Sequence, residues 1–395
     1  MDIKTHTLVI KKLEKVLKDS GKKVEYNVSL ILRLADLYSE RARLKSIKEG
    51  DQDCKDACLG SDKDRRKAIA SYRSLLAHVD GEVGATIIMQ TAHLHQVLGE
   101  VEEAKRLYQG VLKEKSKRSS AIVGQAYAGL AGIQFMQNDF KSALKNYDAA
   151  LKQKDTKKKG FLVYRKAWSM LNTGKTTAAI ATLRGLLSNE TLLDVTDGEN
   201  FTTNKSFRED VSRDYASFLA RKNLKQSDID SLAELSPKSV FEQNLFYLGT
   251  EAERVGQHTA ALMVWDRYLQ NKDISHIQRL EIQTRTAKIL FDLNRKNQAL
   301  VAYKKALGMW KKNGCSDEVD CEGIALKLRN FPIVWNKLEK KKPSALVHAA
   351  YLAFVDTFPK DFEMMNWAAQ ISRKRGKFLQ SSKDYHVAGI KAKPF

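Results

Sequence analysis

A pair of residues four positions apart recurs along this chain of 395 residues and constrains the fold more than any other feature. The first member is alanine in six of seven copies, and the second is aromatic in six. Residues four apart share one face of a helix, so each copy predicts a helix with a small side chain beside a large one. The copies are Ala68/Tyr72, Ala104/Tyr108, Ala143/Tyr147, Ala179/Leu183, Ala261/Trp265, Ala299/Tyr303 and Ser381/Tyr385.

Two further positions precede each of the last six copies. A small residue lies twelve positions before the pair, and glycine or asparagine lies five positions before it. Small residues let consecutive helices approach closely, and glycine or asparagine suits a helix that ends in the left-handed conformation. Each copy therefore predicts two helices joined by a tight turn. The small residues are Ala92, Ala131, Ala167, Gly249, Ala287 and Ala369, and the turn residues are Gly99, Asn138, Gly174, Gly256, Asn294 and Gly376.

One turn lies in the stretch NTGKTTAAI, whose Gly174, Lys175 and Thr176 match the end of a nucleotide-binding phosphate loop. Such a loop needs another glycine five positions before the Gly-Lys pair, where this chain has Ser169. It must also follow a strand, yet the apolar residues of the preceding FLVYRKAWSML have helical spacing. We therefore interpret Gly174 as a turn residue between two helices.

The pattern resembles the tetratricopeptide repeat (TPR), a 34-residue helix-turn-helix unit. The aromatic positions are 36, 39, 36, 82, 38 and 82 residues apart, so each long gap predicts one more divergent helical pair, near 205–236 and near 322–358. The resemblance implies an all-α fold, a TPR-like α-solenoid in which antiparallel helix pairs form a right-handed superhelix. Most copies lack the proline that usually closes the repeat, which leaves the angles between repeats open.

The expected organisation follows the copies along the chain. It comprises an N-terminal helix (1–27), a helix pair with a cysteine-containing insertion (28–78), three TPRs (79–200), a divergent pair (201–241), two TPRs (242–314), and a divergent pair with the last TPR (315–395). In the first pair, Ala35 matches the small residue but precedes Ala68 by 33 positions instead of twelve. The extra 21 residues predict an insertion in the turn between the helices, and this insertion contains Cys54 and Cys58.

The four cysteines form two local pairs, Cys54/Cys58 and Cys315/Cys321. One zinc site would need both pairs, but each repeat of a solenoid touches only its neighbours, so we expect no bound metal. Two local disulfides are one interpretation, since both spacings allow the required geometry, and they would indicate an oxidising compartment such as the periplasm. Four reduced thiols in the cytosol are the alternative.

The formal net charge of +21 predicts attraction to an acidic partner, which can be a protein, a nucleic acid or an anionic envelope surface. Lysine runs lie at 113–118, 152–159, 337–342 and 373–377. The first three suit helix C-termini, and the alternative is that the runs form a basic edge that holds an anionic surface. No apolar stretch is long enough to span a bilayer. The first twenty residues predict an amphipathic helix, so an exported protein would have had its signal removed from this chain.

No pattern of residues predicts catalysis or a cofactor. His93 and His95 lie two apart on an expected helix without a third metal ligand at a suitable spacing, which favours surface and groove roles. No serine or cysteine has the context of a nucleophile elbow, and GEVG at 81–84 lacks the third glycine of a dinucleotide loop. We therefore expect a protein that is not an enzyme and that takes no small-molecule substrate.

The resemblance implies that the first helix of each repeat lines a groove for extended or helical peptides. Tyr164 and Trp168, four apart, would form one aromatic patch there, although Trp168 can instead pack between helices. The carboxylate-binding pattern of some co-chaperones is absent, because Met89, His93, Ala128 and Gly132 occupy its positions. The expected groove residues are His93, Gln96, Phe135, Tyr164, Trp168, Phe246, Glu253, Lys288 and Phe291.

Four phrases carry a narrower resemblance: RLADLYSERA, VYRKAWSMLNTGKTTAAIATL, FREDVSRDYASFLA and FVDTFPKDF. They are similar to envelope TPR proteins of gliding and predatory deltaproteobacteria, which are associated with periplasmic and outer-membrane motility assemblies. The resemblance implies a periplasmic scaffold for an acidic or envelope-associated protein. A cytosolic adaptor is one alternative. A basic RNA-binding array is another, although the repeats lack matching polar residues that would read one base each.

Overall fold

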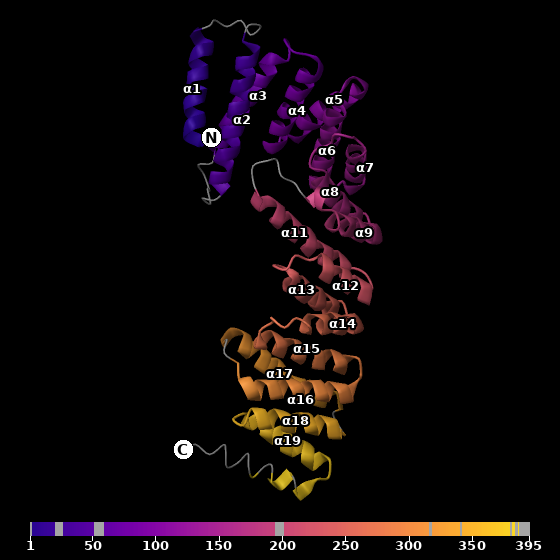
Figure 1. The fold of residues 1–395 in the computed structure, drawn as a ribbon. Coiled ribbons are helices and arrows are strands. Elements are labelled where there is room, and N and C mark those ends of the chain that lie inside the picture. The colour runs from indigo at the N-terminus through magenta and orange to yellow at the C-terminus, as the bar shows by residue number, and fades with distance from the viewer. Residues whose placement is uncertain are drawn as a thin grey trace. The chain divides into compact units, whose positions relative to one another are not determined.

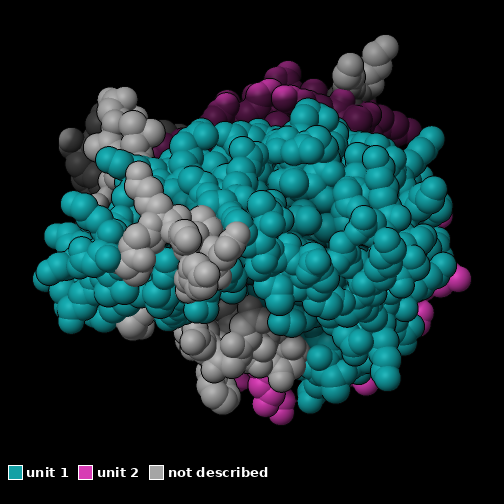
Figure 2. Space-filling view, turned by 90° about the horizontal axis from the view of Figure 1, so that it is seen from above, with its two compact units in different colours: residues 1–211 teal, residues 212–395 magenta. Residues whose placement is uncertain are grey.

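The computed structural model describes residues 2–19, 27–50, 59–193, 201–315, 318–339, 342–379, 381–383 and 386. These residues form helices and connecting turns, and no strand occurs among them. The chain divides into two compact units, unit 1 (Met1–Val211) and unit 2 (Ser212–Phe395), which Figure 2 colours separately. The division falls within one helix, α11 (Phe201–Leu219).

Helices of unit 1 follow one another as antiparallel neighbours (Figure 1). The pairs expected from the sequence are α2 with α3, α4 with α5, α6 with α7 and α8 with α9, and each pair is in contact. A short helix, α10, follows the last pair and packs on it. The bounds are α1 Ile3–Asp19, α2 Val28–Gly50, α3 Leu59–Leu75, α4 Gly81–Val97, α5 Val101–Lys113, α6 Ser120–Met136, α7 Phe140–Leu151, α8 Lys159–Asn172, α9 Thr176–Leu187 and α10 Glu190–Leu193.

Unit 2 continues with the same kind of pairing (Figure 1). The two ranges in which the sequence predicts divergent pairs contain α11 with α12 and α17 with α18. Two regular pairs, α13 with α14 and α15 with α16, lie between them along the chain. The bounds are α12 Gln226–Leu235, α13 Phe241–Arg254, α14 His258–Leu269, α15 His276–Asp292, α16 Lys296–Asn313, α17 Glu318–Glu339, α18 Ala345–Thr357 and α19 Phe362–Lys374.

Repeated small residues lie where the helices of a pair come closest. All the repeated alanines of both helices are fully buried, from Ala68 to Ala369, and the described aromatic residues of the pairs are buried beside them. Gly249 shows how close this contact can be, because a Cβ atom there would lie 2.5 Å from the Trp265 ring. A side chain at this position would push the two helices apart.

The turns between paired helices confirm the prediction made from glycine and asparagine. All six turn residues have positive φ angles, from 58° at Asn294 to 79° at Gly174. Gly174 follows helix α8, and Lys175 caps the start of α9. The Gly-Lys-Thr sequence is therefore a helix-to-helix turn and does not form a phosphate loop.

In the first pair, the sequence-based estimate of the insertion was wrong. Helix α2 extends to Gly50 and α3 begins at Leu59, so most of the extra residues lengthen the helices instead of the turn. Many of them, such as Arg41, Lys45 and Asp64, form charged contacts between α2 and α3. Cys54 and Cys58 lie outside the described residues.

The lysine runs follow helix ends as expected for cations at the negative end of the helix dipole. Lys113 lies in the last turn of α5, Lys337 in that of α17 and Lys374 in that of α19. The run at 152–159 starts directly after α7. None of the described helices is long and apolar enough to cross a membrane.

Candidate partner-binding pockets

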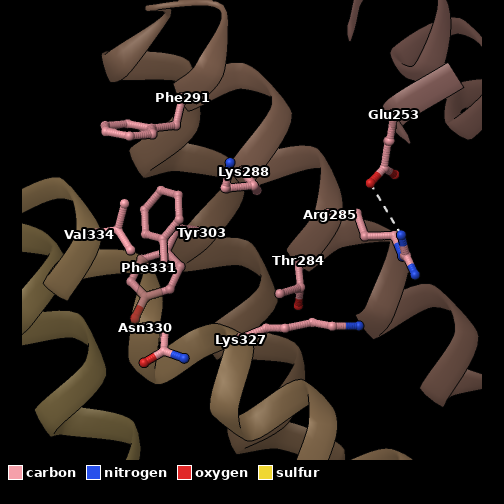
Figure 3. A pocket seen from close by; sticks show the side chains of 10 residues that line it. All are labelled: Glu253, Thr284, Arg285, Lys288, Phe291, Tyr303, Lys327, Asn330, Phe331 and Val334. Atoms are coloured by element: carbon pink, nitrogen blue, oxygen red, sulfur yellow. Dashed lines mark hydrogen bonds and ion pairs between the residues drawn. The ribbon is translucent and has the colours of Figure 1, made fainter. Parts of the chain in front are cut away.

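The first helices of three consecutive pairs in unit 2, α13, α15 and α17, enclose a pocket with a volume of about 280 Å³ (Figure 3). Three residues that the sequence predicts for a groove, Glu253, Lys288 and Phe291, line it together. The second helix α16 adds one aromatic residue at the floor. This unit 2 pocket is lined by Glu253, Thr284, Arg285, Lys288, Phe291, Tyr303, Lys327, Asn330, Phe331 and Val334.

The floor of the unit 2 pocket is aromatic. Tyr303 and Phe331 stack with their ring centroids 4.5 Å apart, and Phe291 meets Phe331 edge-on at 5.7 Å. Trp335 packs beneath them, 5.1 Å from Phe291. Phe291 is only 9% exposed, so it serves the core as well as the pocket, a double role that the sequence did not predict.

A proline explains why a tyrosine is needed at this floor. Pro332 lies inside α17 and has no backbone N–H, so the carbonyl of Leu328, four residues earlier, lacks its helical partner. The Tyr303 hydroxyl donates to this carbonyl oxygen at 2.8 Å. Burial raises the pKa of Tyr303 well above its usual value, which keeps the hydroxyl protonated as a donor.

Replacing Tyr303 by Phe is therefore expected to lower the free energy of unfolding by about 1–3 kcal/mol, because it leaves a buried carbonyl without a donor. The matched control is Tyr147→Phe, the equivalent position in α7, whose hydroxyl makes no hydrogen bond within the described chain. In a Pro332→Ala background the residue 332 N–H can satisfy Leu328, so Tyr303→Phe should cost less there. Urea unfolding of the four variants measures this, and equal costs for Tyr303→Phe in both backgrounds would refute it.

Ion pairs surround the opening of the unit 2 pocket. Glu253 accepts a hydrogen bond from the Trp265 indole at 2.7 Å and pairs with Arg285 at 3.2 Å. Glu281 pairs with Arg285 at 2.9 Å and with Lys327 at 2.8 Å. Burial by itself would raise the pKa of Glu281, but these cations outweigh it and lower the pKa, so Glu281 is charged at neutral pH.

Two lysines at the opening, Lys288 and Lys327, are more exposed than the carboxylates that pair with them. Lys288 pairs with Asp292 at 2.5 Å, and the side chains are 56% and 27% exposed. Lys327 is 47% exposed, whereas its partner Glu281 is 19% exposed. Both lysine side chains are therefore accessible to solvent at the pocket.

A second pocket in unit 1 uses the same repeat positions. Its volume is about 310 Å³, and its first-helix residues come from α4, α6 and the start of α8. Counted from the small residue of the first helix, the positions three before, two before, one after and four after line both pockets. These are Met89, Gln90, His93 and Gln96 around Ala92 in unit 1, and Thr284, Arg285, Lys288 and Phe291 around Ala287 in unit 2.

The lining of the unit 1 pocket is mixed, with polar side chains beside the aromatic residues Tyr108 and Phe161. Tyr108 donates a hydrogen bond to the Gln96 amide oxygen at 3.2 Å. Gly129 allows this ring to fit, since a Cβ atom there would lie 2.4 Å from it. Burial lowers the pKa of His93, and the positive charges of Lys158 and Arg65 lower it further, which favours a neutral imidazole at pH 7.

The other expected groove residues do not line either pocket. The Phe135 ring lies 4.9 Å from the Arg165 guanidinium, and Tyr164 meets Phe207 edge-on at 5.7 Å. Trp168 is half-buried. In unit 2, Phe246 packs 5.6 Å from Trp265, beneath Arg285.

His95 is not the surface residue that the sequence suggested. It is only 5% exposed, hydrogen bonds to the Glu100 carboxylate and lies 3.1 Å from the Arg73 guanidinium. These contacts tie α4 to α3 and to the turn before α5. Within the described ranges, no cluster of three His, Cys, Asp or Glu side chains is placed to hold a metal ion.

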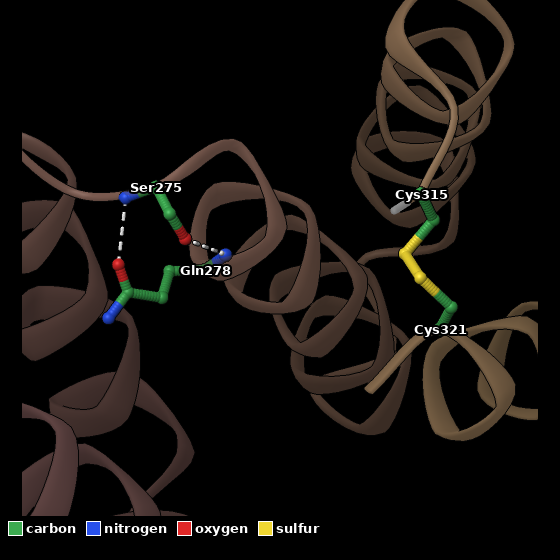
Figure 4. The surroundings of a disulfide bond; sticks show 4 residues. All are labelled: Ser275, Gln278, Cys315 and Cys321. Carbon is green, nitrogen blue, oxygen red and sulfur yellow. Dashed lines mark hydrogen bonds between the residues drawn. A yellow bond between two sulfur atoms is a disulfide. The ribbon is translucent and has the colours of Figure 1, made fainter. Parts of the chain in front are cut away.

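The structure joins Cys315 and Cys321 by a disulfide, with Cα atoms 5.7 Å apart (Figure 4). The bond links the residues after α16 to the first turn of α17. Figure 4 also shows the start of α15, where Ser275 and Gln278 form reciprocal hydrogen bonds of 2.8 and 3.1 Å. This capping box fixes the first turn of α15, one of the two helices that each contribute four residues to the unit 2 pocket.

At the end of α17, a partly buried carboxylate fixes the connection to α18. Glu339 accepts hydrogen bonds from the Trp335 indole at 2.9 Å and the Ser344 N–H at 2.7 Å, and it pairs with Lys296 at 3.0 Å. Burial tends to raise the pKa of Glu339, but the bonds from Ser344, Lys296 and Trp335 outweigh it and lower the pKa to about 2.

This low pKa predicts a loss of stability in acid. The unfolded value is about 4.3, so the contribution of Glu339 is complete above that pH and disappears as the pH falls toward 2. Glu339→Gln should remove this part of the pH dependence and lower stability at pH 7. Urea midpoints measured from pH 2 to 6 test this, and wild-type and variant curves that run parallel across that range would contradict it.

Comparisons with known proteins concern the fold. No protein-family model and no curated protein matches the chain. A tetratricopeptide repeat protein from Parabacteroides merdae is 14% identical, over 74% of this chain and 99% of that one, with a TM-score of 0.32. The apo quorum sensor NprR from B. thuringiensis is 12% identical, over 94% and 100%, with a TM-score of 0.34. The human IFIT1 dimer with m7Gppp-AAAA is 13% identical, over 98% and 95%, with a TM-score of 0.31.

Matches at this level of identity say nothing about function. The assignment of the fold rests on the helices themselves. Paired helices, fully buried small residues and left-handed turns at six fixed positions are the features of a TPR array. The chain is an all-α solenoid built from TPR-like helix pairs.

Proposed function

We propose that this protein is a non-enzymatic scaffold that binds a protein partner on the first-helix side of its units. The observation that carries the proposal is the common register of the two pockets, which occupy equivalent repeat positions in unit 1 and unit 2. Stacked helices offer such pockets along an extended surface, which suits a peptide or a helix of another protein.

We further propose that the scaffold serves a bacterial envelope assembly of the motility type, in the periplasm and associated with the outer membrane. Three observations support this placement: the phrases shared with envelope TPR proteins, the Cys315–Cys321 disulfide and the net charge of +21. A cytosolic adaptor would fit the same helices. RNA binding is the second candidate, because the charge also favours a polyanion.

Affinity capture after mild crosslinking tests the function. The full chain is used as bait in envelope and soluble fractions, with and without nuclease. We expect the bait to capture envelope proteins that remain bound after nuclease treatment. A Tyr164→Ala, Trp168→Ala variant of the bait should no longer capture them. Val301→Ala, on an exposed site of the second helix α16, is the control and should capture normally.

Two other outcomes of the capture experiment are informative. Capture that disappears with nuclease supports RNA binding and refutes the scaffold. Loss of the helical circular dichroism signal in the Tyr164→Ala, Trp168→Ala variant would show that these two residues belong to the core. Partner capture is then compared between the wild type and the Val334→Trp variant.

Non-reducing peptide mapping of protein from its native source should find the Cys315–Cys321 disulfide, and four free thiols would refute the periplasmic placement.

A further inference from the structure

The size of the unit 2 pocket limits what can enter it. Its volume of about 280 Å³ lies just below the roughly 300–1,000 Å³ of pockets that enclose drug-sized ligands. A single large side chain fits this volume, whereas a whole helix does not. The pocket therefore suits one anchoring side chain of a longer segment.

The chemistry of the floor selects an apolar anchor. The Tyr303 hydroxyl is already bonded to the Leu328 carbonyl, and the Thr284 hydroxyl donates to the Leu280 carbonyl at 2.8 Å. What remains toward the cavity is the surface of Phe291, Phe331 and Val334 (Figure 3). An aromatic occupant adds edge-to-face contacts with these rings to the gain from burial.

The opening of the pocket has the opposite character. The side chains of Lys288 and Lys327 are more exposed than those of the carboxylates that pair with them. An ammonium group has three donors, so each lysine can bind a further carboxylate. Asn330 also lies at the opening, and its amide has no partner among the described residues, which leaves it available to the backbone of a bound segment.

We propose that the unit 2 pocket binds one aromatic or large aliphatic side chain of a partner segment whose flanking residues are acidic. The apolar side chain fills the floor, and the flanking carboxylates contact Lys288 and Lys327. The net charge of +21 favours the same segment at longer range. This inference rests on the proposed scaffold function and deepens it by naming the chemistry of the partner.

Selection from a random twelve-residue peptide library, displayed on phage and applied to the full chain, tests the proposal. Enriched peptides should carry one aromatic or large aliphatic residue next to Asp or Glu. Replacing that residue by Ala in a synthetic copy should weaken binding roughly tenfold or more, since burying such a side chain contributes about 1.5–3 kcal/mol. Higher salt should also weaken binding, because the charges at the opening are exposed.

A substitution that fills the unit 2 pocket tests whether the selected peptides bind there. Val334→Trp occupies the cavity from its exposed rim, and Leu338→Trp, one turn further along α17 and not part of the lining, is the matched control. We expect Val334→Trp to abolish binding of the selected peptides and Leu338→Trp to retain it. Lys288→Gln with Lys327→Gln should reduce the preference for acidic flanks, and circular dichroism checks that each variant is folded.

The outcomes separate this inference from the proposed function. No enrichment, enrichment of basic peptides, or binding that ignores Val334→Trp overturns the inference. If the cellular partner is still captured by Val334→Trp but not by Tyr164→Ala, Trp168→Ala, the scaffold function stands and the unit 2 pocket is not its anchor. If nuclease removes all capture, the scaffold itself is refuted.

Discussion

Replacing Asp64 by Asn is expected to lower the free energy of unfolding of unit 1 by about 3–5 kcal/mol, the range for removing one partner of a buried ion pair. Asp64 accepts two hydrogen bonds of 2.7 Å from the Arg41 guanidinium and pairs with Lys45 at 2.8 Å. Both Arg41 and Asp64 are buried between α2 and α3. The substitution would leave the Arg41 charge buried without its counter-ion.

The pKa of Asp64 agrees with this expectation. Burial would raise the pKa, yet the bonds from Arg41 and Lys45 outweigh it and lower the pKa. The carboxylate therefore stabilises the fold above its unfolded pKa, and the contribution is lost as the pH falls through the folded value. Stability of the wild type should decrease in acid more steeply than that of Asp64→Asn.

Hydrogen exchange of α2 and α3 peptides measures the loss in the full chain. Asp62→Asn is the control, because Asp62 lies in the same helix and pairs with Arg65, but its side chain is 43% exposed. Its partner Arg65 is buried but also donates to the Ser61 hydroxyl at 3.1 Å. A carboxylate open to water contributes below about 1 kcal/mol, so this variant should change exchange little. Equal effects of the two substitutions would show that burial of the Asp64 pair does not matter.

Replacing Gly160 by Ala is expected to destabilise unit 1 by about 3 kcal/mol, the upper part of the usual range for overpacking. An ideal Cβ atom on Gly160 would lie 1.7 Å from the backbone carbonyl oxygen of Leu192. Because that neighbour is backbone, α10 has to move away from the start of α8. Leu193, now buried, would then become exposed.

Gly185→Ala is the matched control for this prediction. Gly185 lies inside α9, and a Cβ atom there would meet nothing within 4 Å. Alanine is favoured over glycine inside a helix, so this variant should gain up to about 1 kcal/mol. Hydrogen exchange of α8 to α10 should therefore change in opposite directions, and a stable Gly160→Ala protein would contradict the close contact between α8 and α10.

The fold could be predicted largely from local rules. Gly174 and Asn138 were identified as turn residues because few residue types tolerate the left-handed conformation, and both have positive φ angles. Gly249 was identified as a close-contact position because its spacing from Trp265 repeats elsewhere. Such features depend only on the residue and its neighbours along the chain, so they can be predicted from a single sequence.

The candidate pockets depended on contacts between distant segments, and the sequence predicted them only in part. Lys288 and Phe291 lie at repeat positions and were anticipated, but Lys327 and Phe331 come from α17, where the repeat pattern is absent. The pairing of Tyr303 with the Leu328 carbonyl required knowing that α17 packs on α16. His95 was misjudged because its partners lie on other helices.

Crosslinking mass spectrometry of the captured complex shows whether a protein partner lies on the first-helix side. An amine-reactive reagent reports which lysines lie beside the partner. We expect crosslinks at Lys288 and Lys327, which line the unit 2 pocket, and few at Lys304 and Lys305, which are exposed on α16. Crosslinks concentrated at Lys304 and Lys305, or a complex that contains RNA in place of protein, would contradict this expectation.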